Sequence, residues 1–139
     1  MVDYEKFKLK SYSSWDLFLH ANQFPFIGRG YAWARSPQAR SVVDMSVNER
    51  NELFDEVVPD WEKAVSGLWR PDTTNLTFFG NTTQHLHAHL IPRYNSPRFF
   101  EGIEFKDPNP VGNYSPYPKK TLDELTLFKI RDLLSTSLW

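Results

Sequence analysis

The segment that most constrains this chain is QHLHAHLIPR, residues 84–93, in which three of the four histidines occupy alternate positions. Successive side chains of a β-strand point to opposite faces of the sheet, so this alternation predicts a strand. The histidines would share one face, and the leucine and alanine residues between them would form the other. The apolar face predicts contact with a buried core, and the histidine face predicts the wall of a cleft.

The remaining pattern predicts further strands and two helices. Strands are expected over residues 4–9, 15–21, 31–34, 75–79 and 84–91, with the last two forming an antiparallel hairpin. A capping-box pattern opens a long helix at Ser46, and Pro59 predicts a kink or break at Val58. A second capping box at Thr121 opens a C-terminal helix. This order predicts an α+β fold with an antiparallel sheet, one long helix and a C-terminal helix.

Length and composition narrow the class of protein. A chain of 139 residues is expected to form a single domain, with a core at about 15–94, a surface-wrapping loop at 95–120 and a final helix at 121–135. The absence of cysteine excludes disulfides, thiolate metal sites and a cysteine nucleophile. A net charge of −1 gives no general attraction to nucleic acid polymers or anionic membranes. Without a signal-peptide pattern or a run of ~20 apolar residues, the chain is expected to be cytoplasmic.

Strand geometry bears on what three alternating histidines can bind. Side chains on the same face lie ~6.6 Å apart along a strand. His85 and His89 would therefore be separated by roughly 13 Å, whereas zinc–nitrogen bonds measure ~2.1 Å. A metal site would use two adjacent histidines and a ligand from elsewhere. A row of imidazoles suits an extended phosphate chain better, because His87 can attack phosphorus while its neighbours donate hydrogen bonds to phosphate oxygens and the leaving group.

The segment His85–Ile91 and the Pro92–Arg93 that follows it resemble the motif of the histidine triad (HIT) family of nucleotide hydrolases and transferases. The order of predicted elements over residues 15–94 is similar as well. The resemblance implies a HIT-like fold and nucleotidyl transfer through a covalent histidine intermediate. Dinucleoside polyphosphates and nucleoside phosphoramidates are the implied substrates. It also implies a homodimer with no tightly bound cofactor, Mg²⁺ being expected only as a companion of a polyphosphate substrate.

The resemblance assigns roles to individual residues. His87 matches the nucleophile, and the N–H on the opposite side of its ring is expected to be held by a backbone carbonyl. His89 matches the histidine beside the phosphate and leaving group, and His85 the one that supports the site from behind. Three further matches concern the substrate: Asn22 at the ribose hydroxyls, Thr82 near the leaving group, and Asn81 where glutamine is usual in the family.

Two more residues are candidates, each with a structural alternative. His20 shares a strand face with Asn22, so it lines the nucleoside pocket or is a hydrogen-bonded structural histidine. Arg93 contacts phosphate or caps the end of the strand. Gly30 stands where many family members carry a further histidine, and the loop before the triad is short. Two alternatives therefore stay open beside the enzyme: a non-catalytic nucleotide-binding module, and a metal-dependent hydrolase that uses two of the triad histidines.

Overall fold

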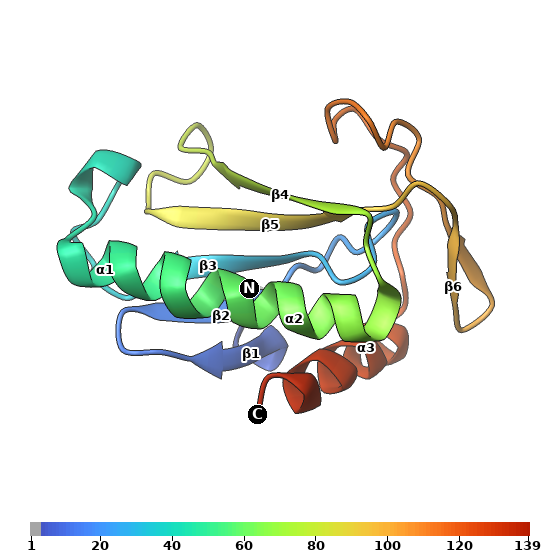
Figure 1. The fold of residues 1–139 in the computed structure, drawn as a ribbon, viewed down its shortest axis with the longest axis horizontal. Helices are drawn as coiled ribbons and strands as arrows, with labels where there is room; N and C mark the ends of the chain where they lie inside the picture. The colour runs from blue at the N-terminus through green and yellow to red at the C-terminus, as the bar shows by residue number, and fades with distance from the viewer. Residues whose placement is uncertain (1–3) are drawn as a thin grey trace.

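A computed structural model describes residues 4–139 and contains a five-stranded antiparallel sheet with strand order β1-β2-β3-β5-β4 (Figure 1). The strands are β1 (Lys8–Ser11), β2 (Trp15–Leu19), β3 (Gly30–Ala34), β4 (Thr73–Phe78) and β5 (His87–Arg93). A second, two-stranded sheet pairs β6 (Arg98–Phe100) with β7 (Ile103–Phe105). With the helices described next, this arrangement confirms the predicted α+β fold.

The helices begin at capping residues. The Ser46 hydroxyl accepts the Glu49 N–H at 3.1 Å and the Glu49 carboxylate accepts the Ser46 N–H at 2.8 Å, so α1 (Val47–Glu52) begins at the predicted capping box. A π-helical turn (Leu53–Val57) joins α1 to α2 (Val58–Trp69). Pro59, which has no N–H to donate, lies just after this turn. The helix is therefore irregular immediately before the predicted kink or break at Val58, but it continues through Pro59 without a break.

The last helix, α3 (Glu124–Ser137), begins later than predicted. Its cap is Asp123, whose carboxylate accepts the Thr126 N–H at 2.8 Å. The expected capping box at Thr121 was therefore wrong by two residues, because aspartate is as good a cap as threonine and stands closer to the apolar run. Of the helices described, none is both long and apolar enough to cross a membrane.

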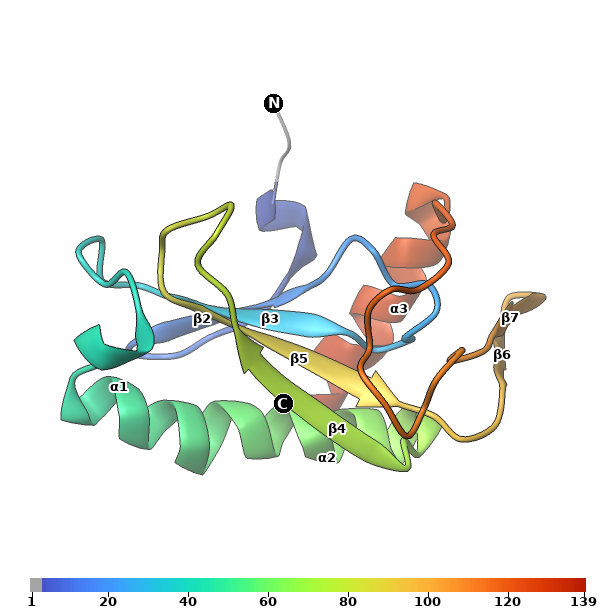
Figure 2. The same ribbon diagram turned by 90° about the horizontal axis from the view of Figure 1, so that it is seen from above.

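The helices α1 and α2 cover one face of the sheet. Figure 2 shows them along one side, with the N-terminal segment and the loop between β4 and β5 on the other. Five strand residues belong to the same core as Trp61 and Val65 of α2. They are small or aliphatic and have essentially no exposed surface: Leu17, Ala32, Ala34, Ala88 and Leu90. The alternation predicted for the histidine segment is therefore confirmed on its apolar side.

All five predicted strands differ in extent from those observed: β2, β3 and β4 by one or two residues at an end, and the first and the last by more. Residues 4–7 form a 3₁₀ turn, and β1 begins only at Lys8. The triad strand begins at His87 rather than at residue 84, because residues 79–86 form a longer loop than the tight connection expected. This loop is tied to the segment after β3, since the Leu86 N–H donates to the Ala39 carbonyl at 3.0 Å and the Leu86 carbonyl accepts the Ala34 N–H at 3.1 Å.

Candidate active site

A cleft of about 1090 Å³ lies on the sheet face opposite α2. Its walls come from the N-terminal segment, from β2 and β3, and from the segment around the start of β5. The structure brings five of the predicted site residues into this cleft: His20, Asn22, His85, His87 and His89. Residues separated by more than sixty positions in sequence thus meet at one concave surface, which is the usual form of a small-molecule site.

Pairing between β3 and β5 sets the positions of the triad. Trp33 lies opposite His87, and Tyr31 lies opposite His89, so both aromatic rings share the histidine face. The rings of His87 and His89 meet edge to face with centroids 4.9 Å apart. His85 precedes the strand, and its ring stacks on Trp33 at 4.2 Å between centroids. Trp33 also stacks on His87 at 5.7 Å, so its indole contacts two of the three imidazoles.

The tautomer of His87 is fixed by the backbone. Its Nδ1 lies 2.6 Å from the carbonyl oxygen of His85. A carbonyl can only accept, so Nδ1 carries the proton and, in the neutral ring, Nε2 carries the lone pair. The expectation that a backbone carbonyl holds the ring of His87 is confirmed, and the ring is supplied with a nucleophilic nitrogen.

His85 is supported by the segment at the end of β3. Its Nε2 donates to the Ala34 carbonyl at 2.6 Å, and Trp33 covers its ring. Gly30 has no part in this support, because a Cβ there would lie 2.8 Å from the Phe18 carbonyl and 3.6 Å from the indole nitrogen of Trp61 on α2. A side chain at position 30 would thus face the helix layer. Many family members are expected to carry a histidine at this position, but a histidine at position 30 of this chain would point away from the cleft.

Burial keeps two of the cleft histidines uncharged. Desolvation, with a smaller effect of the Arg29 charge, lowers the pKa of His20 to about 3. Desolvation, followed by the charges of His87 and Arg29, lowers the pKa of His89 to about 4. The two rings lie 5.8 Å apart, and the Nδ1 atom of His20 accepts the Asn22 N–H at 3.0 Å. At neutral pH each ring carries a single N–H, so each is both a donor and an acceptor.

The lowered pKa values predict acid sensitivity of the fold. The folded-state pKa of His20 and His89 lies below the ordinary value of 6.5, so between pH 6.5 and 4 the unfolded chain binds more protons. Stability is full above pH 6.5 and falls as the pH drops below it. Between pH 7 and pH 5 we expect a loss of roughly 2 kcal/mol, allowing for solvent screening. Urea unfolding at pH 7 and pH 5 measures this difference in the free energy of unfolding. The His20→Gln variant should lose less stability over the same pH range than the unchanged protein. An equal loss would contradict the assignment of the effect to His20.

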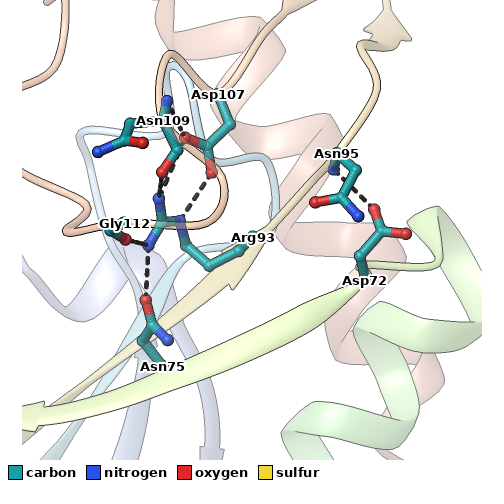
Figure 3. A network of polar contacts seen from close by, with 7 residues as sticks. All are labelled: Asp72, Asn75, Arg93, Asn95, Asp107, Asn109 and Gly112. Atoms are coloured by element: carbon teal, nitrogen blue, oxygen red, sulfur yellow. Dashed lines mark hydrogen bonds and ion pairs between the residues drawn. The ribbon is translucent and has the colours of Figure 1, made fainter.

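Three predicted site residues lie outside the cleft. Asn81 and Thr82 are exposed in the 79–86 loop, whereas Thr83 and His85 of the same loop line the cleft wall. Arg93 is 2% exposed and forms a buried ion pair with Asp107, at 2.7 Å from Nε (Figure 3).

The remaining Arg93 contacts account for its other donors. The guanidinium donates to the Asn75 side chain and to the Gly112 carbonyl, each at 2.8 Å, and to the Asn109 carbonyl. A second bond to Asp107, from the NH2 nitrogen at 3.2 Å, uses the fifth N–H, so all five donors are satisfied within the protein. These contacts match the structural alternative, in which Arg93 secures the end of β5.

Sequence reasoning missed several residues that build the cleft. The alternation of Tyr31, Ala32, Trp33 and Ala34 gave a hint, since its aromatic members face the histidines. Gln23 gave none: it is fully buried, and its amide nitrogen donates to the carbonyls of His20 and Arg29, both at 2.7 Å. Such a contact depends on the folded turn, which the linear sequence does not reveal.

Comparison with known proteins identifies the fold. No protein-family profile and no curated protein matches the chain. Solved structures do match, among them a histidine triad protein from Bradyrhizobium japonicum, with 17% identity, a TM-score of 0.72, and 95% of this chain and 90% of that one covered. A hypothetical histidine triad nucleotide-binding protein from Sulfolobus tokodaii gives 14% identity, a TM-score of 0.72 and coverage of 95% and 83%.

A third match is a zinc-bound histidine triad family protein from Mycobacterium smegmatis, with 14% identity, a TM-score of 0.63 and coverage of 95% and 83%. The chain therefore has the histidine triad fold. Within residues 4–139, no three histidine, cysteine, aspartate or glutamate side chains come together as a metal site.

Proposed function

We propose that this protein, which has the histidine triad fold, is a nucleotidyl hydrolase or transferase whose nucleophile is Nε2 of His87. One observation carries the proposal: the Nδ1–H of His87 is held by the His85 carbonyl, which leaves a lone pair on the other ring nitrogen in a cleft. An imidazole in this state is a competent nucleophile near neutral pH. The hydrogen bond also stabilises the ring when it becomes positively charged on attack.

In the first step, Nε2 attacks the phosphorus atom that joins the nucleoside to its leaving group. A nitrogen–phosphorus bond forms, and the bond from phosphorus to the leaving group breaks with its electron pair going to the leaving group. His89 is placed to assist, because its ring lies 4.9 Å from that of His87 and is uncharged at neutral pH. Its single N–H can donate to a phosphate oxygen or to the departing atom.

In the second step, water attacks the same phosphorus atom and loses a proton to solvent, and the nitrogen–phosphorus bond breaks with its electron pair returning to Nε2. The products are a nucleoside monophosphate and the original neutral His87, so the protein is regenerated. Transfer to another acceptor follows the same path with that acceptor in place of water. The side chains invoked for bond making are those of His87 and His89, and the reaction needs no redox partner.

The cleft fits a nucleoside phosphate derivative. Its wall includes the polar histidines and, beside them, the stacked pair Phe18 and Tyr31, with centroids 5.1 Å apart. Asn22 lies at its rim, where its amide can hydrogen-bond to ribose hydroxyls. Dinucleoside polyphosphates and nucleoside phosphoramidates combine the required parts: a base for the apolar wall, hydroxyls for an amide, and phosphates for the histidines.

Trapping of the intermediate tests the proposal. Adenosine 5′-phosphoramidate or diadenosine tetraphosphate, mixed with the protein and quenched in alkali, should give an acid-labile adduct with the mass of one adenylyl group on the peptide that contains His87. The same mixture should release AMP. A matched control is Gln84→Ala, an exposed neighbour in the same peptide, which should form the adduct as the unchanged protein does.

The alternatives give different results in the same experiment. A binding module would show AMP affinity with neither adduct nor product after long incubation. A metal-dependent hydrolase would contain stoichiometric zinc or iron after purification and would lose it on His85→Ala. Either result would reject the covalent mechanism.

A further inference from the structure

Arg29 is a buried cation on the histidine face of the sheet. It is 4% exposed, and none of the ion pairs among the described residues includes it. Its partners are instead aromatic: NH1 donates to the Tyr117 hydroxyl at 3.0 Å, and the guanidinium carbon lies 5.6 Å from the ring centroids of Tyr114 and Tyr117. The Nε atom is buried without a partner. Burying such a charge is costly, which calls for an explanation beyond packing.

The chain register places Arg29 beside two cleft histidines. The His20 N–H donates to the Arg29 carbonyl at 3.0 Å, which extends the β2–β3 pairing by one position and puts the two side chains on one face. Arg29 is also two residues before Tyr31, the direct partner of His89, so it lies diagonally across from His89. Gln23 fixes this geometry by donating to the carbonyls of both His20 and Arg29.

The C-terminal segment 106–120 holds Arg29 in place. Asp107 at its start pairs with Arg93, and its two tyrosines lie against the guanidinium of Arg29. Tyr114 also contacts Phe79 at 6.3 Å between centroids, and Phe79 contacts His89 at 5.5 Å. The segment is therefore connected to His89 of the triad through the side chain of Phe79.

We propose that Arg29, held under Tyr114 and Tyr117, is a positioning residue whose charge adds to burial in disfavouring protonation of His20 and His89. A fixed positive charge beside an imidazole disfavours its protonation, and burial of that charge prevents water from screening it. The consequence for catalysis rests on the proposed function: His89 then remains a neutral hydrogen-bond donor to a lower pH than burial alone would allow.

Electrostatics around the two rings supports this role. The titratable or charged groups that face them are His87 on β5, Tyr31 on β3, Arg29, and Lys119 of the 106–120 segment. The Arg29 charge ranks directly after burial in lowering the pKa of His20, and it contributes for His89 after burial and His87. On the other side of the guanidinium, burial alone would raise the pKa of Tyr117, but the hydrogen bond and charge of Arg29 lower it.

Imidazole NMR on the ligand-free protein tests the proposal. In the unchanged protein, the ring signals of His20 and His89 should remain those of neutral histidine down to about pH 5. Arg29→Met removes the charge and keeps the bulk, and should raise both titration midpoints by about one pH unit. Arg29→Lys retains the charge and should stay close to the unchanged protein. Arg50→Met, an exposed arginine on α1, is the matched control and should change neither midpoint.

Several outcomes would overturn the proposal. One is a midpoint of 6 or above for both rings in the unchanged protein, which needs no variant to be folded. Others are unchanged midpoints in a folded Arg29→Met protein, or an equal rise in Arg29→Lys.

Activity gives a separate readout, since the acid limb of kcat/KM should move upward in Arg29→Met and not in Arg50→Met. Because the NMR titration needs no turnover, failure of the proposed function would leave it interpretable.

Discussion

Replacement of His87 by alanine should lower the rate of AMP release from adenosine 5′-phosphoramidate by roughly a thousandfold or more. The ring supplies the attacking nitrogen, and no other side chain in the cleft offers an imidazole held in the same way by a carbonyl acceptor on its Nδ1. His89 lacks this support, since its Nδ1 is buried without a partner. The measurement is single-turnover kinetics at pH 7.5 with the unchanged protein as reference.

Binding separates loss of chemistry from loss of the site. AMP affinity of His87→Ala, measured by calorimetry, should stay within about tenfold of the unchanged protein, because a single lost hydrogen bond contributes ~1 kcal/mol. Turnover at the unchanged rate would reject the mechanism. Loss of turnover together with all AMP binding would instead indicate that His87 holds the cleft open.

A leaving-group series distinguishes the two histidines. His89→Ala should slow poor leaving groups, on whose departing atom more negative charge develops, far more than good ones, because it removes the hydrogen bond that the neutral ring donates there. His87→Ala should slow all of them alike, because every substrate requires the nucleophile.

The sequence predicts the features of this fold that depend on local spacing. Alternation of histidine with Leu86, Ala88 and Leu90 encodes two strand faces within one short segment, and the burial of those three residues confirms it. The capping box at Ser46 likewise involves groups only three residues apart. Patterns of this kind are visible in a linear sequence because their physical cause is local.

The features that the sequence does not reveal depend on distant contacts. His85 lies outside the strand, where its ring donates to the Ala34 carbonyl and stacks on Trp33. More than fifty residues separate His85 from these two partners in the sequence. Loop 79–86 carries Asn81 and Thr82 outside the cleft, because Leu86 bonds to residues 34 and 39 instead of continuing a tight hairpin. The position of Arg29 depends on tyrosines near the C-terminus. None of these positions can be predicted from the sequence alone, because each depends on contacts that form only in the tertiary fold.

Arg93 shows why a motif position alone is an uncertain guide to role. It follows the triad directly, where a phosphate contact is a natural expectation, but Asp107 meets it from fourteen residues away. Both side chains are almost fully buried, with 2% and 0% of their surface exposed. A buried ion pair of this kind anchors the 106–120 segment over the end of β5, and thereby the tyrosines that contact Arg29.

Asp107→Asn should therefore lower the free energy of unfolding by about 3–5 kcal/mol, because it leaves the Arg93 guanidinium buried without its counter-charge. The substitution keeps the shape of the side chain and an oxygen for the Asn109 N–H, which Asp107 accepts at 3.0 Å. A loss of this size is a large part of the ~5–15 kcal/mol that stabilises a typical domain. Urea unfolding monitored by tryptophan fluorescence measures it from the transition midpoint and slope.

An exposed ion pair provides the matched control. Lys129 and Glu101 lie 3.2 Å apart with 46% and 43% of their side chains exposed, so Lys129→Met should cost less than ~1 kcal/mol. A double variant, Arg93→Met with Asp107→Leu, removes both charges and should recover part of the loss seen in Asp107→Asn. If Asp107→Asn instead left stability unchanged and raised only the KM for a nucleotide substrate, Arg93 would belong to the substrate site after all, because its guanidinium would then be acting on phosphate rather than on the 106–120 segment.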